Sequence, residues 1–354
     1  MRLIHTSDLH LDSPLTSRLS PIKARERKRE LISSFRKIID DAKRLDAEGI
    51  IIAGDLFDSD AVGVRTLETV IGIIESSSPT LFFYLPGNHE GSRLTTAGIE
   101  LPENLKIFGT GWTYYELGDT TLAGRSEIDE TAFSTLELNP ERKNILILHG
   151  ELTDRTASPD KIGRRELVTL PTDYVALGHY HSYSETSLGD RAVAVYCGTP
   201  EGRGFDEVGE LGYSLIEIGS YSVNHRFVKH SMRSMRIVEV DISGAQRMLD
   251  IENRIAEAII KISEHDLVRA VLVGEYEPGV KPDVELLSDR FKNSSYYFEV
   301  KDESRLRISI EDYVNDKSLK GEFIRLVLSQ KELSREERDA IIECGIRALA
   351  GEIV

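Results

Sequence analysis

The sequence is poor in cysteine and has no long apolar runs. Two cysteines among 354 residues, Cys197 and Cys344, are too few for a disulfide framework or a thiolate metal site. Each is interpreted as a small buried apolar residue. No uncharged apolar stretch reaches the length of about 18 residues that a membrane span requires, and the first residues lack the pattern of a secretory signal. These absences predict a cytoplasmic protein that does not span a membrane.

Positive charge is also scarce. The sequence has 44 lysines and arginines against 60 aspartates and glutamates, a formal net charge of −16. This balance argues against a protein that holds nucleic acid by its overall field. A pair of divalent ions would reverse the field locally, so a nucleic-acid substrate stays open. The basic run at residues 23–29 is interpreted as the solvated face of a helix.

Apolar residues, at 40% of the chain, suffice for a sizeable core. Through the first 200 residues, short apolar runs that end in polar or glycine-containing turns alternate with segments of helical period. This pattern is typical of α/β layering with strands buried on both faces. Helices are predicted at residues 31–45 and 64–74. Strands are predicted at residues 3–4, 50–53, 81–85, 145–148, 174–177 and 192–196, and antiparallel strands within 112–122 and 212–227.

The character of the sequence changes near residue 233. Alternating strand and helix patterns from there to residue 310 predict a compact α+β unit. Ser334 and Glu337 then stand in capping-box spacing ahead of an apolar stripe, which predicts a C-terminal helix. The expected division is a large α/β domain at 1–232, the α+β unit at 233–316 and a helical segment at 317–354.

Residues typical of metal sites follow five of the predicted strands. Ligands gather outside the carboxyl ends of strands in open α/β sheets, so side chains far apart in sequence are expected to converge there. A two-residue spacing, as in Asp8/His10, keeps both side chains on one side of an extended segment. The predicted metal ligands are Asp8, His10, Asp55, Asn88, His149, His179 and His181.

The donor set limits the ion. Carboxylate, amide and imidazole without thiolate fit Mn²⁺, Fe²⁺ or Zn²⁺ better than a closed structural zinc site. Seven donors exceed what one ion with an open position needs, and they suit two ions about 3.5–4 Å apart. Asp55 is the natural bridge because it is the lone carboxylate of its loop. One histidine at a strand end is more often a satisfied polar residue, but five of the nine histidines fall in these motifs. The remaining four are interpreted as core (His5) and surface (His225, His230, His265).

Five blocks together resemble the signature of the calcineurin-like metallophosphoesterases. They are residues 8–10 (DLH), 54–58 (GDLFD), 87–90 (GNHE), 149–150 (HG) and 178–181 (GHYH). Within that superfamily, residues 4–12 (IHTSDLHLD) and 197–202 (CGTPEG) resemble the SbcD-type (meiotic recombination eleven) DNA-repair nucleases. The resemblance implies an α/β fold, a layered metallophosphoesterase sandwich with a smaller α+β capping domain and a C-terminal helix.

The resemblance also divides the ligands between two ions, with Mn²⁺ expected first and Fe²⁺, Zn²⁺ or Mg²⁺ as alternatives. One ion would take Asp8, His10, Asp55 and His181, and the other Asp55, Asn88, His149 and His179. His89 would be the catalytic residue that protonates the leaving oxygen or stabilises charge on the phosphoryl group. Some members carry a second histidine where this chain has Asp58, so the role of that histidine is not carried over.

The prediction for function is a two-metal phosphodiester hydrolase. The resemblance makes it a DNA exo- or endonuclease of DNA repair and recombination that works with an SMC-like ABC ATPase of the SbcC type, with a homodimer left open. One alternative is a phosphodiesterase or phosphatase for nucleotides or small phosphate esters. Another is a metal-binding scaffold that recruits an ATPase without cutting. The ATPase-binding element would be the helix after Ser334 or be absent.

Overall fold

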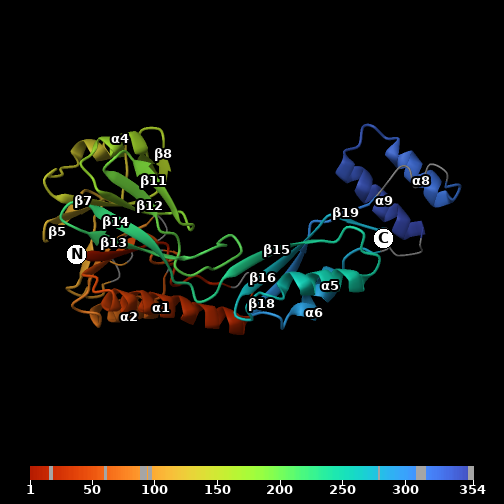
Figure 1. The fold of residues 1–354 in the computed structure, drawn as a ribbon, viewed down its shortest axis with the longest axis horizontal. Helices are drawn as coiled ribbons and strands as arrows, with labels where there is room; N and C mark the ends of the chain where they lie inside the picture. Colours follow the sequence, from red (N-terminus) through yellow and green to blue (C-terminus); the bar gives the residue numbers. More distant parts are fainter. Residues whose placement is uncertain are drawn as a thin grey trace. The chain divides into compact units, whose positions relative to one another are not determined.

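The computed structural model describes residues 1–15, 19–59, 62–87, 94, 98–277, 280–307 and 316–349. It divides into two compact units, Met1–Met235 (unit 1) and Arg236–Val354 (unit 2), and each is drawn in Figure 1. The predicted first boundary at 232/233 lies close to this division. A separate segment from residue 317 stays a prediction.

Unit 1 is built on two six-stranded sheets. In spatial order the first contains β14 (Val223–Lys229), β13 (Gly212–Ile218), β1 (Arg2–Thr6), β2 (Gly49–Ala53), β3 (Leu81–Leu85) and β4 (Leu105–Ile107). The second contains β11 (Ser184–Leu188), β12 (Ala192–Tyr196), β10 (Tyr174–Gly178), β7 (Lys143–His149), β6 (Thr120–Gly124) and β5 (Thr113–Leu117). The inner strands run parallel, and β13, β14, β5 and β11 pair antiparallel toward the edges.

Burial on both faces explains why the sequence of β2 is apolar throughout. All of its residues are buried. Ile50 and Ile52 pack in a cluster with the helices, whereas Ile51 and Ala53 pack in the cluster between the two sheets. Successive strand side chains point to opposite faces, so a strand covered on both faces needs a continuous apolar run. The two sheets therefore form a sandwich with one shared inner core.

Helices cover the outer faces of the sandwich (Figure 1). The helices α1 (Pro21–Arg44) and α2 (Val64–Glu75) pack on the first sheet, and α4 (Arg164–Thr169) packs on the second. The helix α1 begins ten residues before the predicted apolar stripe and includes the basic run at 23–29, because Ser20 accepts a bond from the Lys23 backbone N and Pro21 occupies the first turn. The predicted solvated face is wrong for Arg27, which is 1% exposed. Unit 1 also contains the turn η1 (Ala132–Thr135) and the short strands β8 (Glu151–Thr153) and β9 (Lys161–Gly163).

Unit 2 is an α+β unit. Its elements are β15 (Met235–Asp241), α5 (Met248–Ile259), β16 (Leu267–Val273), β17 (Glu275–Tyr276), α6 (Val284–Phe291), β18 (Tyr297–Asp302), β19 (Arg305–Leu306), α8 (Leu319–Leu328) and α9 (Arg335–Leu349). The order β15-β16-β18 forms the main sheet, and α5 and α6 lie along it in Figure 1. Ser334 and Glu337 exchange the two bonds of a capping box at the start of α9. The predicted fold class is thus confirmed.

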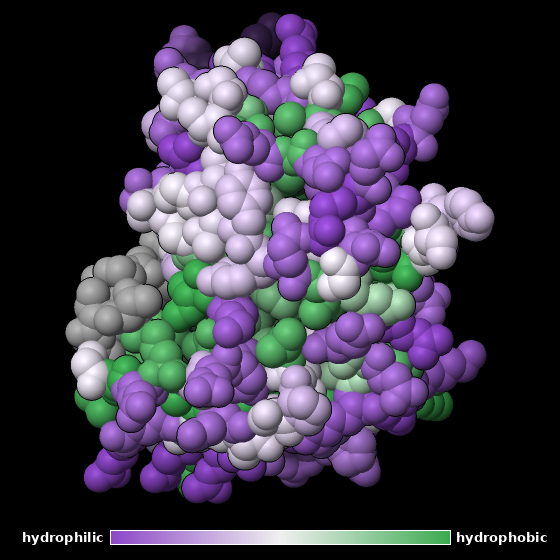
Figure 2. All heavy atoms as spheres, turned by 90° about the vertical axis from the view of Figure 1, so that its left-hand side faces the viewer, coloured by the Kyte–Doolittle hydropathy of each residue, from purple (hydrophilic) through white to green (hydrophobic). Residues whose placement is uncertain are grey.

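Exposure tests the remaining sequence interpretations. His5 is fully buried as predicted, but His230, predicted at the surface, is only 2% exposed. Cys197 is buried, whereas Cys344 is exposed, so the prediction of a buried apolar role is wrong for Cys344. In Figure 2, hydrophilic side chains cover the top and bottom of one face of unit 1, and apolar ones reach the surface between them. Within the described ranges, no helix is both long and apolar enough to cross a bilayer.

Candidate metal centre

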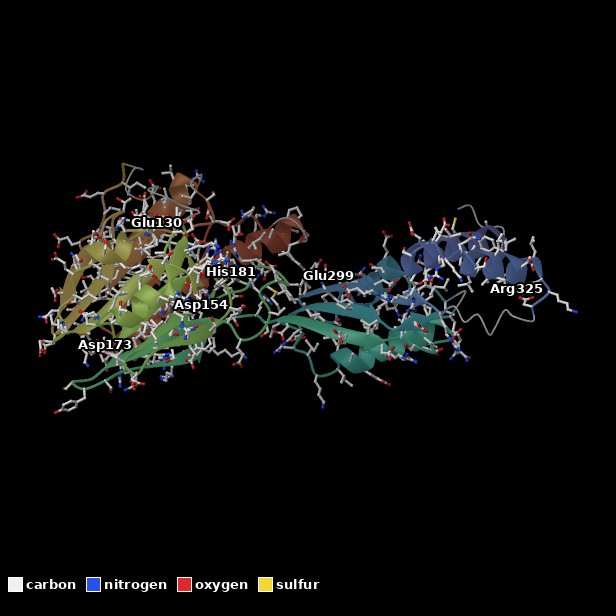
Figure 3. The ribbon with its side chains drawn as sticks, turned by 90° about the horizontal axis from the view of Figure 1, so that it is seen from above. Glu130, Asp154, Asp173, His181, Glu299 and Arg325 are labelled. Carbon is white, nitrogen blue, oxygen red and sulfur yellow. The ribbon has the colours of Figure 1, made fainter. Side chains whose placement is uncertain are left out.

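Predicted ligands converge at the carboxyl ends of β1, β2, β7 and β10. Ligand atoms of Asp8, His10 and His181 lie within 4.8 Å of one another, and so do those of Asp8, Asp55 and His149. Figure 3 labels His181 just after β10 and Asp173 just before it, at opposite ends of that strand. Parallel strands of two facing sheets thus bring together side chains spread over more than 170 positions of sequence. Asn88 and His89 lie outside the described residues.

Two buried carboxylates form the middle of this centre. Oδ2 of Asp55 lies 3.4 Å from Nε2 of His149 and 3.9 Å from Nε2 of His10. Oδ1 of Asp8 lies 3.9 Å from Nε2 of His181. Asp55 therefore faces imidazoles assigned to both ions, as a bridging ligand must. Asp8 also belongs to both close groups of donors, a feature that the sequence did not indicate.

The backbone is strained where it carries these side chains. Asp8, His10 and Asp55 have φ angles of 51°, 45° and 50°, in the left-handed region that residues with a Cβ seldom adopt. Gly54, at φ 90°, lies so close to His149 that a Cβ there would collide with the Nδ1 of its ring. A Cβ on Gly87 would collide with the carboxylate of Asp55. Such strain persists only where the surrounding structure holds it, and it clusters at functional sites.

Three imidazoles are each oriented by a contact at their Nδ1 atom. Nδ1 of His149 bonds the Ala53 carbonyl at 2.9 Å, while Nδ1 of His181 and of His10 meet carboxylates of Glu207 at 2.8 Å and Asp58 at 3.0 Å. Each Nε2 then points toward Asp8 or Asp55. Outer partners of this kind orient metal-ligating histidines. The donor set and its geometry therefore fit divalent metal ions.

His179 reaches the centre differently. Its backbone N donates to both carboxylate oxygens of Asp8, at 3.1 and 3.2 Å. Its ring lies edge-on to that of His149, with centroids 5.6 Å apart. It joins neither of the two close groups of donors, so its role as a ligand stays a prediction.

Burial and the opposing charges set the protonation of the centre. Burial raises the pKa of the Asp8 carboxyl. Burial alone would lower the pKa of His149, but the carboxylates of Asp55 and Asp8 outweigh it and raise that pKa to about 9. The hydrogen bond to Glu207 raises the pKa of His181, and burial lowers the pKa of His179. Despite its burial, Glu207 has a pKa of about 2 because it bonds His181 and Arg203. Without bound metal ions, a proton on His149 therefore supplies positive charge next to the buried carboxylates.

Sequence reasoning missed Arg203 and Glu207. Arg203 joins Glu207 at 2.8 Å and Asp58 at 2.6 Å, close to His181. A signal was present, because the two residues are four positions apart directly after the block at 197–202. An arginine and a glutamate at that spacing are common in exposed helices, so the pattern alone does not indicate a site.

A cavity of about 920 Å³ adjoins the centre. Its walls include Gly87, Phe108, Ile128, Asp129, His149 and Asp160. On another side, the ring of Tyr180 is 44% exposed and packs against Tyr196 and His179, with centroids 4.9 and 5.3 Å away. The Tyr196 hydroxyl donates to the Gly150 carbonyl at 2.7 Å and accepts from the Leu152 N at 2.8 Å, which fixes that support. The centre thus has both a hollow and a held aromatic surface beside it.

Comparison with known proteins gives relatives at low identity. An uncharacterized metallophosphoesterase, YhaO of Bacillus subtilis, is 26% identical over 298 residues, covering 77% of this chain and 72% of its own length. The DNA double-strand break repair protein Mre11 of Methanosarcina mazei is 25% identical over 261 residues, covering 70% of this chain and 41% of its own. Mre11 of Saccharolobus solfataricus is 23% identical over 386 aligned positions, covering 100% of this chain and 97% of its own.

These relatives differ in length, and the chain spans less than half of the Methanosarcina protein. The family pattern itself covers more than half of the chain. The sequence pattern of the family "Calcineurin-like phosphoesterase" matches residues 1–205, which include all seven predicted ligands and His89. The buried carboxylates and oriented imidazoles occupy the matched region. The chain therefore belongs to the calcineurin-like phosphoesterases, a family of phosphoester hydrolases.

Proposed function

We propose that this phosphoesterase cleaves DNA phosphodiester bonds with two divalent metal ions. The observation that carries the proposal is the convergence of buried carboxylates and imidazoles, with each Nε2 directed at Asp8 or Asp55. The ligands would be divided as the resemblance implies, Asp8, His10, Asp55 and His181 for one ion and Asp55, Asn88, His149 and His179 for the other. Mn²⁺ is the metal we propose first.

The residues of the chain would orient substrate and move a proton. Bound divalent ions supply Lewis acidity to the phosphate ester and make water a better nucleophile near neutral pH. The rigid backbone at Asp8, His10 and Asp55 keeps the ligands in place without reorganisation during turnover. His89, which lies outside the described residues, would protonate the departing sugar oxygen.

The proposed role of His89 has a direct test. The variant His89→Ala should keep both ions and lose about 10²–10⁴-fold in turnover, the usual contribution of a general acid. Bound metal is measured by elemental analysis and cleavage by gel assay of labelled oligonucleotides. Cleavage at the parent rate would contradict the assignment.

DNA is favoured as the substrate by two observations. Several relatives carry the name DNA double-strand break repair protein, and Tyr180 presents a supported, 44% exposed ring beside the centre. Aromatic rings of this kind stack on nucleobases, at about 1–3 kcal/mol per base. The net charge of −16 does not oppose DNA at a site where metal ions set the local field.

The experiment compares substrates at fixed metal. Single- and double-stranded oligonucleotides, a mononucleotide panel and bis(p-nitrophenyl) phosphate are each incubated with Mn²⁺ or Mg²⁺. We expect oligonucleotide cleavage to dominate. Tyr180→Leu should raise KM for DNA about tenfold, in the range of one lost stacking contact, with bis(p-nitrophenyl) phosphate turnover unchanged and Tyr180→Phe as the matched control. Activity on mononucleotides alone would assign the cavity beside His149 to a small ester instead.

Assembly belongs to the same proposal. An SMC-like ABC ATPase is the partner we propose, with α9, the helix after Ser334, as the candidate for its binding element, and a homodimer is the proposed oligomer. Size-exclusion chromatography with light scattering, with and without an SMC-like ABC ATPase from the same organism, tests both. A monomer that forms no complex with such an ATPase would contradict them.

A further inference from the structure

One arginine connects two of the predicted ligands through their outer partners. The Arg203 guanidinium contacts Oδ1 of Asp58 at 2.6 Å through Nη1, and Oε1 of Glu207 at 2.8 Å through Nη2 and 3.1 Å through Nε. Asp58 follows β2, whereas Arg203 and Glu207 follow β12. A planar guanidinium holds two carboxylates in fixed directions, which a single ammonium cannot do.

Each of these carboxylates also contacts a histidine ring. Oδ1 of Asp58 lies 3.0 Å from Nδ1 of His10, and Oε1 of Glu207 lies 2.8 Å from Nδ1 of His181. The two rings meet edge-on with centroids 5.2 Å apart, and both Nε2 atoms point toward the carboxylates of Asp8 and Asp55. Arg203 thus stands behind both imidazoles of a single close group, Asp8, His10 and His181.

Asp58, Arg203 and Glu207, which we call the clamp, are held in place by their surroundings. Glu207 is 1% exposed, and its Oε2 accepts the Arg203 backbone N at 2.5 Å. The backbone N of Glu207 bonds the Gly204 carbonyl at 3.0 Å. The backbone N of Asp58 bonds Oδ1 of Asp12 at 2.6 Å. A clamp fixed at both ends can hold the two rings in one orientation.

We infer that Asp58, Arg203 and Glu207 are positioning residues that set the affinity of one metal ion, the ion held by Asp8, His10 and His181. This inference rests on the proposed metal centre. His149, an imidazole of the other close group, is oriented by the Ala53 backbone carbonyl instead, so the clamp does not reach it. Removing the clamp should therefore weaken one ion and spare the other. The inference also gives Asp58, where some family members have histidine, a role of its own.

The test is a titration of the chelator-stripped full chain with Mn²⁺. Binding is measured by calorimetry and by the electron paramagnetic resonance spectrum of Mn²⁺. The variants are Asp58→Ala and Arg203→Met, with Arg203→Lys as the conservative substitution. In Asp58→Ala and Arg203→Met, one of two binding steps should weaken about 10–100-fold, as for other outer partners of metal ligands, while the second keeps the parent affinity. The spectrum should then show an isolated ion at Mn²⁺ concentrations where the parent shows a coupled pair. Arg203→Lys should recover part of the loss.

Asp173→Asn is the matched control. Asp173 is a buried carboxylate paired with Arg191 at 3.0 Å and with Lys143 at 3.4 Å, at the opposite end of β10 from His181 (Figure 3). Its loss should lower Tm and leave both Mn²⁺ affinities unchanged, which separates a general loss of stability from an effect on one ion. If Arg203→Met does not fold, Asp58→Ala decides, because the Asp58 side chain is 27% exposed and its truncation leaves little cavity.

The outcomes separate this inference from the function on which it rests. Unchanged affinities in Asp58→Ala and Arg203→Met, or an equal loss at both steps, would overturn the positioning role while the metal centre stands. A parent protein that binds no Mn²⁺ would overturn the proposed function itself. A selective loss of one ion in both variants, absent from Asp173→Asn, supports the clamp.

Discussion

Two clusters of buried charge in unit 1 are neutralised differently. In the first, which we call the arginine cluster, Arg27 bonds Glu30, Glu201 and the Gly202 carbonyl, and Arg233 bonds Glu30 at 2.6 Å. Arg27 and Glu201 are each 1% exposed. Two guanidinium charges here balance two carboxylates. In the second, the metal centre, the carboxylates of Asp8 and Asp55 pair with histidines, which carry charge only when protonated.

The difference separates a structural site from a functional one. The arginine cluster is complete in itself, and it ties α1 to the segments around residues 201 and 233. Guanidinium contacts hold the pKa of Glu30 below its usual value even though burial raises it. In the metal centre, the carboxylates of Asp55 and Asp8 instead raise the pKa of His149 to about 9, which favours its protonated form. A buried site whose carboxylates face imidazoles rather than fixed guanidinium charges is suited to accept a cation from solution.

Asp55→Ala should give the largest effect on activity and metal binding, and it tests the metal centre directly. Activity and the second bound ion should be lost, because Asp55 faces imidazoles of both groups. In chelator, the free energy of unfolding should equal or exceed that of the parent, since a buried carboxylate without a fixed cation is removed. Urea unfolding with and without Mn²⁺ is the measurement. At Mn²⁺ about 100 times its dissociation constant, the parent should gain about 2.7 kcal/mol and the variant should gain less.

Arg27→Met should show the opposite pattern at the arginine cluster. It leaves Glu201 buried without its guanidinium partner, which typically costs about 3–5 kcal/mol. The loss should appear in urea unfolding equally with chelator and with Mn²⁺. Arg44→Gln is the control, because Arg44 lies on the same helix but forms an exposed pair with Asp41, so its unfolding midpoint should stay near that of the parent. A loss for Arg27→Met that Mn²⁺ restores would contradict the separation of the two clusters.

His230 should show the smallest effect at neutral pH, because it is a buried group kept neutral. Burial lowers its pKa to about 4, with Lys37 acting in the same direction and Ser34 and Asp41 against it. The unfolded chain, with a histidine pKa near 6.5, binds the proton more readily. Stability should therefore fall as pH decreases from about 6.5 to about 4, by up to roughly 3 kcal/mol. The measurement is the difference in unfolding free energy between the parent and His230→Gln across this range, and an equal pH slope in both would contradict it.

Much of the fold followed from local pattern. Strands such as β2 and β10 are apolar throughout because both of their faces are covered, and that composition is visible in one segment alone. The capping box of α9 is equally local, since Ser334 and Glu337 bond one another. In the first turns of α1 the basic run was recognised as a helix face, but nothing in it indicated that Arg27 is buried. Its burial depends on Glu201, which lies 174 positions away in sequence.

The candidate site was predictable in kind but not in detail. Side chains at the carboxyl ends of parallel strands must meet, so Asp8, Asp55 and His149 could be grouped from order alone. The outer partners could not, because Asp58 meets Glu207 through Arg203, which lies 145 positions from Asp58 in sequence. The surface prediction for His230 failed for the same reason. Its neighbour Lys229 is exposed, but the ring itself bonds Ser34 of α1 at 3.0 Å.

The types of donor atom, their order along the chain and the strands that carry them can be read from local sequence, because strand periodicity and the residues after each strand are local properties. Which buried carboxylates receive an arginine and which face imidazoles depends on the folded arrangement. That choice depends on which loops of two facing sheets approach within hydrogen-bonding distance, and burial makes an approach of a few ångströms decisive because unpaired charge is costly away from water.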